Sequence, residues 1–140
     1  TRLQDSNLES EMRNVVAKFQ RQTGVHASID FHGTGAPLAP EQQLQVLFIL
    51  QEALSNVRKH AQASQVQVLV ENERDFSLRV ADDGSGFTME DAQNKGESHV
   101  GLRIMQERAQ RLSAQFDIQS QRGQGTTILL RLERTERLVA

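Results

Sequence analysis

Three polar residues of different kinds recur at helical spacing between residues 52 and 59. At about 100° per residue, Glu52, Asn56 and Lys59 fall within one narrow arc of a helix, with His60 next to them. An acid, an amide and a cation on one face can polarise a reactant, ligate a hard metal ion and neutralise an anion. An ordinary solvated face with helical side-chain pairs is the alternative, which this segment alone does not exclude.

A second group lies where an alternating apolar segment ends. Asp82 continues the buried side of the pattern Phe76, Leu78, Val80, and two glycines, Gly84 and Gly86, follow it. Glycines let a flat ligand approach the backbone closely, and a buried carboxylate can accept a hydrogen bond from an exocyclic amine. A simple Asp-Gly turn is the alternative, since such turns are common.

Two more glycine segments lie further along the chain. Gly101 and Leu102 are expected to open a helix, whose free N–H groups and positive dipole end would suit a phosphate. Residues 123–127 (GQGTT) are expected to start a strand. A plain helix entry and a hairpin glycine pair are the respective alternatives.

The elements that must position these residues follow from hydrophobic periodicity. Apolar residues at helical spacing predict helices, and alternation predicts strands. Helices are expected at residues 7–22, 40–61 and 101–112, and strands at 25–31, 66–70, 76–80, 116–118 and 126–132. Residues 88–100 are polar and aperiodic, which predicts a mobile loop that becomes ordered when ligand binds.

Short turns join adjacent strands, and strands and helices do not alternate regularly. We therefore predict an α+β fold, a two-layer α/β sandwich whose mixed sheet is covered on one face by helices. The expected organisation is a linking or packing helix at residues 1–23, one domain at 24–134 and a frayed tail at 135–140.

Composition excludes several classes of protein. The 140 residues carry a net charge of −2, 37% apolar residues and no Cys, which excludes a disordered chain, disulfides and thiolate chemistry. Aromatic residues make up only 4%, and there is no general basic field, so no nucleic-acid partner is expected. The longest apolar run, at residues 46–50, is too short to span a bilayer, so no direct membrane contact is expected. Without an initiator Met, the chain is expected to be a fragment of a longer protein.

Four motifs in this order resemble the ATP-binding domain of sensor histidine kinases, within the superfamily shared with gyrase and Hsp90 ATPases. The N box is matched by residues 51–61 (QEALSNVRKHA), the G1 box by 82–87 (DDGSGF), the G2 box by 99–109 (HVGLRIMQERA) and the closing motif by 123–126 (GQGT). The G2 segment is most similar to the subgroup paired with LuxR-type response regulators, which includes nitrate/nitrite sensors. The resemblance implies a Bergerat-type ATP-binding fold.

The resemblance also implies roles for individual residues. Asp82 would accept from the adenine amino group, helped by Thr126 through a water, while Gly84 and Gly86 would admit the purine. Asn56 would ligate Mg²⁺. The remaining implied residues act at the phosphates. Lys59 and Arg103 would contact them as cations, and Glu52 would be a polarising acid near the γ-phosphate. Gly101 and Leu102 would close over the phosphates as the loop before them, the ATP lid, becomes ordered.

The implied enzyme is a protein-histidine kinase that transfers the γ-phosphoryl group of Mg²⁺-ATP to a histidine, from which it passes to a response-regulator Asp. No phosphoacceptor His motif is present, so the acceptor is expected on a separate dimerisation domain. The parent is expected to be an inner-membrane homodimer with this domain in the cytoplasm. A serine kinase of the anti-sigma type, a gyrase- or Hsp90-like ATPase and a non-catalytic nucleotide sensor are the alternatives.

Overall fold

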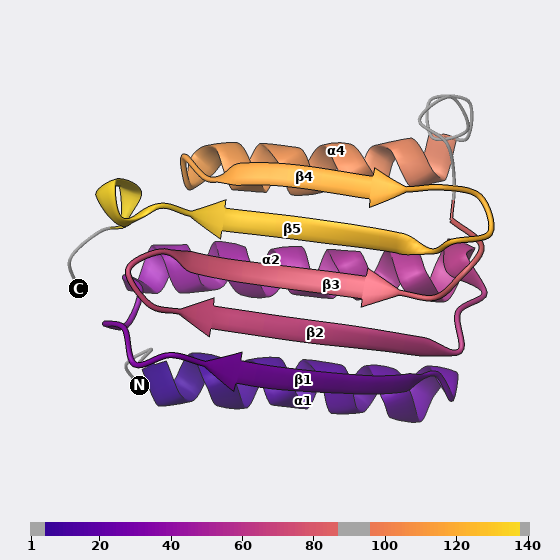
Figure 1. The fold of residues 1–140 in the computed structure, drawn as a ribbon, viewed down its shortest axis with the longest axis horizontal. Helices are drawn as coiled ribbons and strands as arrows, with labels where there is room; N and C mark the ends of the chain where they lie inside the picture. The colour runs from indigo at the N-terminus through magenta and orange to yellow at the C-terminus, as the bar shows by residue number, and fades with distance from the viewer. Residues whose placement is uncertain (1–4, 87–95, 138–140) are drawn as a thin grey trace.

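The computed structural model describes residues 5–86 and 96–137 (Figure 1). One mixed five-stranded sheet has the order β1-β2-β3-β5-β4, in which β1 runs parallel to β2 and all other neighbours are antiparallel. The strands are β1 (His26–His32), β2 (Gln65–Asn72), β3 (Phe76–Asp82), β4 (Gln115–Ser120) and β5 (Thr126–Leu132). The helices α1 (Asp5–Thr23), α2 (Pro40–Asn56) and α4 (Gly96–Arg111) all lie on one face of the sheet (Figure 1).

This architecture confirms the predicted α+β sandwich with a mixed sheet. Alternate residues of the strands form apolar rows that face the helices, because neighbouring strands keep their side chains in register. One row joins Val68, Val80, Ile128 and Ile118 across four strands. The helices cover these rows with fully buried side chains, among them Met12 of α1, Ile49 of α2 and Met105 of α4.

The central helix α2 carries much of the site and begins as the sequence predicts. Pro40 lies in its first turn, where a backbone N–H is not needed for the helical hydrogen bonds. The negative charge of Glu41 in the same turn is stabilised by the positive end of the helix dipole. The α-helix ends at Asn56, and a π-helical turn, η1 (Val57–Ala61), continues it up to Gln62 in the left-handed conformation. Glu52 and Asn56 lie in the α-helix, whereas Lys59 lies in the π turn, which is wider than an α turn. The spacing that put all three residues on one face of a regular helix therefore does not extend to Lys59.

The start of α4 differs from the prediction. The helix begins at Gly96, so Gly101 lies inside it and does not open it. The prediction that Gly101 and Leu102 open this helix is therefore wrong, while their role at the phosphates stays a prediction. The helix was predicted to begin at Gly101 because the segment before it is polar and aperiodic. In the structure, the missing side chain of Gly101 makes room for Asn56 of the neighbouring helix. Residues 96–100 of the predicted loop are helical, and residues 87–95 lie outside the described part.

The C-terminal segment is attached to the end of the sheet remote from Asp82. After β5, a short 3-10 turn, η2 (Arg134–Glu136), leads to Arg137. The Arg137 guanidinium donates hydrogen bonds to the backbone carbonyls of Glu73 and Arg74, at 2.7 and 3.2 Å. These hydrogen bonds attach Arg137 to the turn between β2 and β3. The division into segments 1–23, 24–134 and 135–140 stays a prediction.

Candidate functional site

A polar row crosses the sheet at the end where β3 stops. Asp82 of β3 pairs in register with Val66 of β2 and with Thr126 of β5, and Thr126 pairs with Ser120 of β4. Each polar residue lies two positions along its strand from a residue of the apolar row, so its side chain faces the helix layer as well. The sheet thus presents a carboxylate and two hydroxyls at the margin of its hydrophobic core.

The Asp82 carboxylate is only partly satisfied by the protein. It accepts a hydrogen bond from the backbone N–H of Gly84 at 2.8 Å. Burial raises the pKa of Asp82 above its usual value, the nearby backbone groups of Gly84 and Thr126 oppose this rise, and the charge of Asp83 adds to it. A half-buried acid held in this way favours a ligand that brings a hydrogen-bond donor.

Asp83 has the opposite surroundings. Its carboxylate accepts from the Ser64 hydroxyl at 2.6 Å and from the backbone N–H groups of Ser64 and Gln65, both at 2.9 Å. The hydrogen bond from the Ser64 hydroxyl is the main reason why the pKa of Asp83 lies below its usual value. Asp83 therefore fastens the start of β2 to the end of β3.

Glycines make the turn after Asp82 possible. A Cβ on Gly125 would lie 2.1 Å from the Asp82 carbonyl oxygen, and one on Gly86 would lie 2.0 Å from the Gln121 carbonyl oxygen. Both glycines have positive φ, 80° and 65°. In addition, the Gly123 N–H donates to the Ser85 carbonyl at 2.6 Å. The β4–β5 hairpin and the segment after β3 therefore pack backbone to backbone beside the polar row, and Gly84 between them is buried.

The amide of Asn56 lies where α2 meets α4. A Cβ on Gly101 would lie 2.7 Å from Asn56 Oδ1, so the absent side chain is what admits the amide between the helices. Glu52 and Asn56 are half-buried, whereas Lys59 and Arg103 are exposed. Leu102 is a core residue, 7% exposed. The structure thus brings Asn56 and Gly101 together, and it leaves Lys59 and Arg103 free to turn toward a solvent-side anion.

Arg108, the second arginine of the G2 segment, packs away from this junction. Its guanidinium lies 3.9 Å from the centre of the Phe48 ring and donates to Gln45 Oε1 at 3.4 Å. Both partners belong to α2, so Arg108 holds α4 on α2. Arg103, by contrast, is exposed to solvent.

The oxygen-bearing side chains present fit a magnesium ion that is coordinated mainly by the phosphates of a bound nucleotide. Among the side chains that the structure describes, no three His, Asp or Glu residues come together as a metal cluster. Mg²⁺ commonly keeps several waters and binds through one or two protein oxygens together with phosphate oxygens. The half-buried Asn56 amide oxygen can be such a protein ligand, provided that a phosphate chain supplies the rest.

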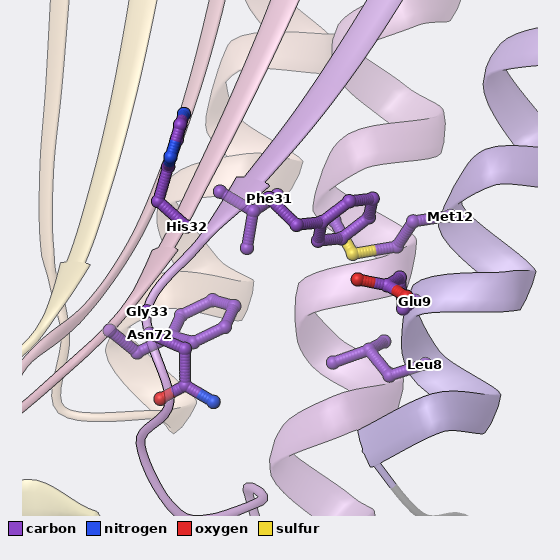
Figure 2. Close-up of a pocket in the computed structure, with 9 residues that line it drawn as sticks. Leu8, Glu9, Met12, Phe31, His32, Gly33 and Asn72 are labelled. Carbon is purple, nitrogen blue, oxygen red and sulfur yellow. The ribbon is translucent and has the colours of Figure 1, made fainter.

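Two small cavities lie elsewhere. One of about 100 Å³ is enclosed by Leu8, Glu9 and Met12 of α1 and by Phe31, Gly33 and Asn72 at the opposite end of the sheet (Figure 2). The other, about 220 Å³, lies between the first turn of α2 and the end of α4. Neither includes a residue of the polar row or of the Asn56–Gly101 junction. In the described ranges, no helix is long and apolar enough to cross a membrane.

Comparison with known proteins decides the family. The model of the histidine kinase-, DNA gyrase B-, and HSP90-like ATPases matches residues 41–136, which include the polar row, Asn56 and Gly101. This chain belongs to that ATPase family. The family predicted from the four motifs is thereby confirmed.

Relatives of this ATPase-family chain are sensor kinases. The histidine-protein kinase/phosphatase DegS of Brevibacillus brevis is 33% identical over 129 residues, 91% of this chain and 33% of the relative. The nitrate/nitrite sensor protein NarQ of Escherichia coli (strain K12) is 29% identical over 136 residues, 96% of this chain and 24% of the relative. The chain therefore spans a third or less of the length of these proteins.

A solved structure confirms the fold of the ATPase-family domain. The histidine kinase domain of the Erythrobacter litoralis EL346 blue-light activated histidine kinase has a TM-score of 0.70 over 92% of this chain and 62% of that one, at 19% identity. The relatives agree with the prediction of an ATP-binding catalytic domain of a sensor histidine kinase. The roles predicted for individual site residues stay predictions.

Two contributors were missed from the sequence alone. Gly125 was predicted only as part of a glycine pair, and Ser120 lies beyond the strand predicted at 116–118, yet both lie beside the Asp82–Thr126 pair. The signal that could have found them is strand register, since Ser120 lies six residues before Thr126 across a hairpin.

Proposed function

We propose that this chain is the catalytic domain of a two-component sensor histidine kinase. It binds Mg²⁺-ATP and delivers the γ-phosphoryl group to a histidine on a separate dimerisation domain, from which the group passes to a response-regulator Asp. The observation that carries the proposal is the half-buried Asp82 carboxylate, still open to a donor, on the same sheet margin as Thr126.

The adenine end of the ligand belongs at the polar row. The exocyclic amine donates to Asp82, and the neighbouring Thr126 hydroxyl assists through a water. Gly84 and Gly86 follow Asp82 without side chains that would block a flat ring. The apolar row next to Asp82, which includes Val80 and Ile128, offers the base a nonpolar floor.

The phosphate end belongs at the junction of α2 and α4. The Asn56 amide oxygen would ligate Mg²⁺, and the bound ion would offset the negative charge of the phosphates. Lys59 and Arg103 neutralise phosphate oxygens, Glu52 polarises the region of the γ-phosphate, and Gly101 and Leu102 border it. Phosphoryl transfer needs little covalent work from this domain, since positioning and charge neutralisation dominate.

The relatives suggest the setting of the parent protein. NarQ is a nitrate/nitrite sensor protein, which supports a parent that is a sensor. From the resemblance to sensor histidine kinases, we propose that the parent is an inner-membrane homodimer with this domain on the cytoplasmic side. The partners would be the parent's own dimerisation domain and a response regulator of the LuxR type.

A water-directed ATPase is the second candidate, because Glu52 is half-buried one helical turn before Asn56. Glu52 would then act as a general base toward water. Release of free phosphate by the isolated chain at a steady rate distinguishes this candidate from the kinase, which needs its histidine partner.

The metal assignment is tested by Asn56→Asp. This change keeps the size of the side chain but removes the amide and adds a charge beside the phosphates. We expect the magnesium-dependent gain in affinity for a fluorescent ATP analogue to fall by about tenfold.

Gln51→Glu is the matched control, because Gln51 is an exposed neighbour on the same helix and the variant adds the same charge. It should leave the magnesium dependence within about twofold of the wild type. If Asn56→Asp and Gln51→Glu behave alike, the metal role of Asn56 is wrong.

A further inference from the structure

A hydroxyl pair lies beneath the proposed base site. Ser120 Oγ lies 2.7 Å from Thr126 Oγ1, and Ser120 Oγ also donates to the Gly125 carbonyl at 3.2 Å. Both hydroxyls are half-buried on the helix-facing side of the β4–β5 hairpin. We propose that Ser120 is a positioning residue for base selectivity, which orients Thr126 so that its oxygen meets the base as an acceptor. This inference rests on the proposed function, which puts adenine beside Asp82 and Thr126.

The direction of the hydrogen bonds follows from the number of protons. A carbonyl oxygen only accepts, so the bond between Ser120 and Gly125 uses the single hydroxyl proton of Ser120. The bond between the two hydroxyls must then take its proton from Thr126. Thr126 therefore has no proton left for a ligand and offers only an oxygen lone pair.

The Gly125 carbonyl that fixes this direction is itself fixed. Gly125 has φ 80°, a left-handed conformation, and its Cα lies so close to the Asp82 backbone that a side chain would collide with the Asp82 carbonyl. A Cβ on Gly86 would lie 3.0 Å from the Gly125 carbonyl oxygen. The acceptor of the Ser120 proton is thus wedged between two backbone segments and cannot rotate away.

Two acceptors side by side select the base. Asp82 and Thr126 both accept, which matches the amino group at position 6 of adenine, either directly or through one water. Guanine has a carbonyl at that position, and acceptors facing an acceptor leave buried groups unsatisfied. Without Ser120, the Thr126 proton is free to turn toward a carbonyl, so the selectivity against guanine should weaken.

The test compares Ser120→Ala and Ser120→Thr in the 140-residue chain. Dissociation constants for Mg²⁺-ATP and Mg²⁺-GTP are measured by competition against a fluorescent ATP analogue. Ser120→Ala should lower the ratio of ATP to GTP affinity by about threefold or more, mainly through tighter GTP binding. Ser120→Thr keeps the hydroxyl on a strand that tolerates β-branching, and it should retain the wild-type ratio.

Thr127→Val is the matched control, because Thr127 is the next residue and faces the opposite side of the sheet, where it pairs with Gln119. It should leave the ratio unchanged. An unchanged ratio in Ser120→Ala, or an equal loss of both affinities, overturns the positioning role while wild-type preference for ATP still supports the proposed function. A wild-type chain that binds neither nucleotide overturns both.

Discussion

Asp82 and Asp83 are neighbours in the chain with opposite electrostatic surroundings. Burial raises the pKa of Asp82, while the Ser64 hydroxyl and two backbone N–H groups lower the pKa of Asp83. Strand alternation explains the difference, because adjacent residues at a strand end point to opposite faces. One aspartate is thereby left for a ligand, and the other fastens the backbone that holds it.

Asp82→Asn should stabilise the free domain at neutral pH, by about 0.5–1 kcal/mol, because it removes a poorly satisfied charge. The folded state holds the Asp82 proton more tightly than the unfolded state, so wild-type stability falls as pH rises from the usual aspartate pKa through the raised one. The gain should therefore disappear as pH falls below the usual value. Thermal unfolding of both proteins across this pH range measures it, and a loss of stability at neutral pH would contradict it.

Asp83→Asn is the companion variant with the opposite expectation. The pKa of Asp83 is lowered in the folded state, so its stabilising effect is present above the usual aspartate pKa and is lost as pH falls through the folded value. Asp83→Asn should lower the melting temperature at neutral pH and converge with the wild type in acid. It should not alter the ratio of ATP to GTP affinity, which nucleotide competition measures.

At the scale of elements, the site depends on where α2 and α4 touch. Gly101→Ala would normally favour a helix interior by about 1 kcal/mol. Here the new Cβ would lie 2.7 Å from Asn56 Oδ1, the movable end of a side chain, so the fold should survive while Asn56 is displaced. We expect the magnesium-dependent affinity for ATP to fall by about tenfold, with little change in melting temperature.

Gln106→Ala, an exposed position on the same helix, is the control and should change neither quantity. Full magnesium dependence in Gly101→Ala would show that Asn56 does not need its present position. A large loss of stability in Gly101→Ala would instead assign Gly101 to packing alone.

The sequence predicted correctly those helices and strands that depend only on the residue pattern within their own segment. The buried stripe of α2 and the alternation of β3 each follow from a single segment, and so did the inward side of Asp82. The start of α4 was mispredicted, because the reason for Gly101 lies on another helix, at Asn56. The Ser120–Thr126 pair likewise required the register of β4 on β5, which residue types alone do not specify.

At the scale of the molecule, the domain has two unlike ends. The end with Asp82, Thr126 and Asn56 has partly satisfied polar groups, whereas the remote end is fastened by the Arg131–Asp75 ion pair at 2.7 Å and by Arg137. The proposed kinase function predicts that this chain binds nucleotide but remains unphosphorylated when incubated with ATP, because the proposed transfer needs a histidine on a separate domain. When the chain is joined covalently to the proposed dimerisation domain, it should acquire an acid-labile, base-stable phosphate from γ-labelled ATP.

Acid-stable phosphate on the rejoined protein would instead favour a serine kinase. Labelled phosphate that is only released to water would favour the ATPase candidate. ATP binding without either product would leave a nucleotide sensor as the function.

The most direct measurement for the adenine site is competition between ATP and GTP for the wild-type chain and for Asp82→Asn. An ionised acid that faces the guanine carbonyl leaves both groups unsatisfied, so ATP should bind the wild type at least about tenfold more tightly than GTP. Asp82→Asn can rotate its amide to offer a donor, and it should weaken ATP binding and reduce that preference. Equal affinity of the wild type for ATP and GTP, or an unchanged ratio in Asp82→Asn, would contradict the assignment of this sheet margin as the adenine site.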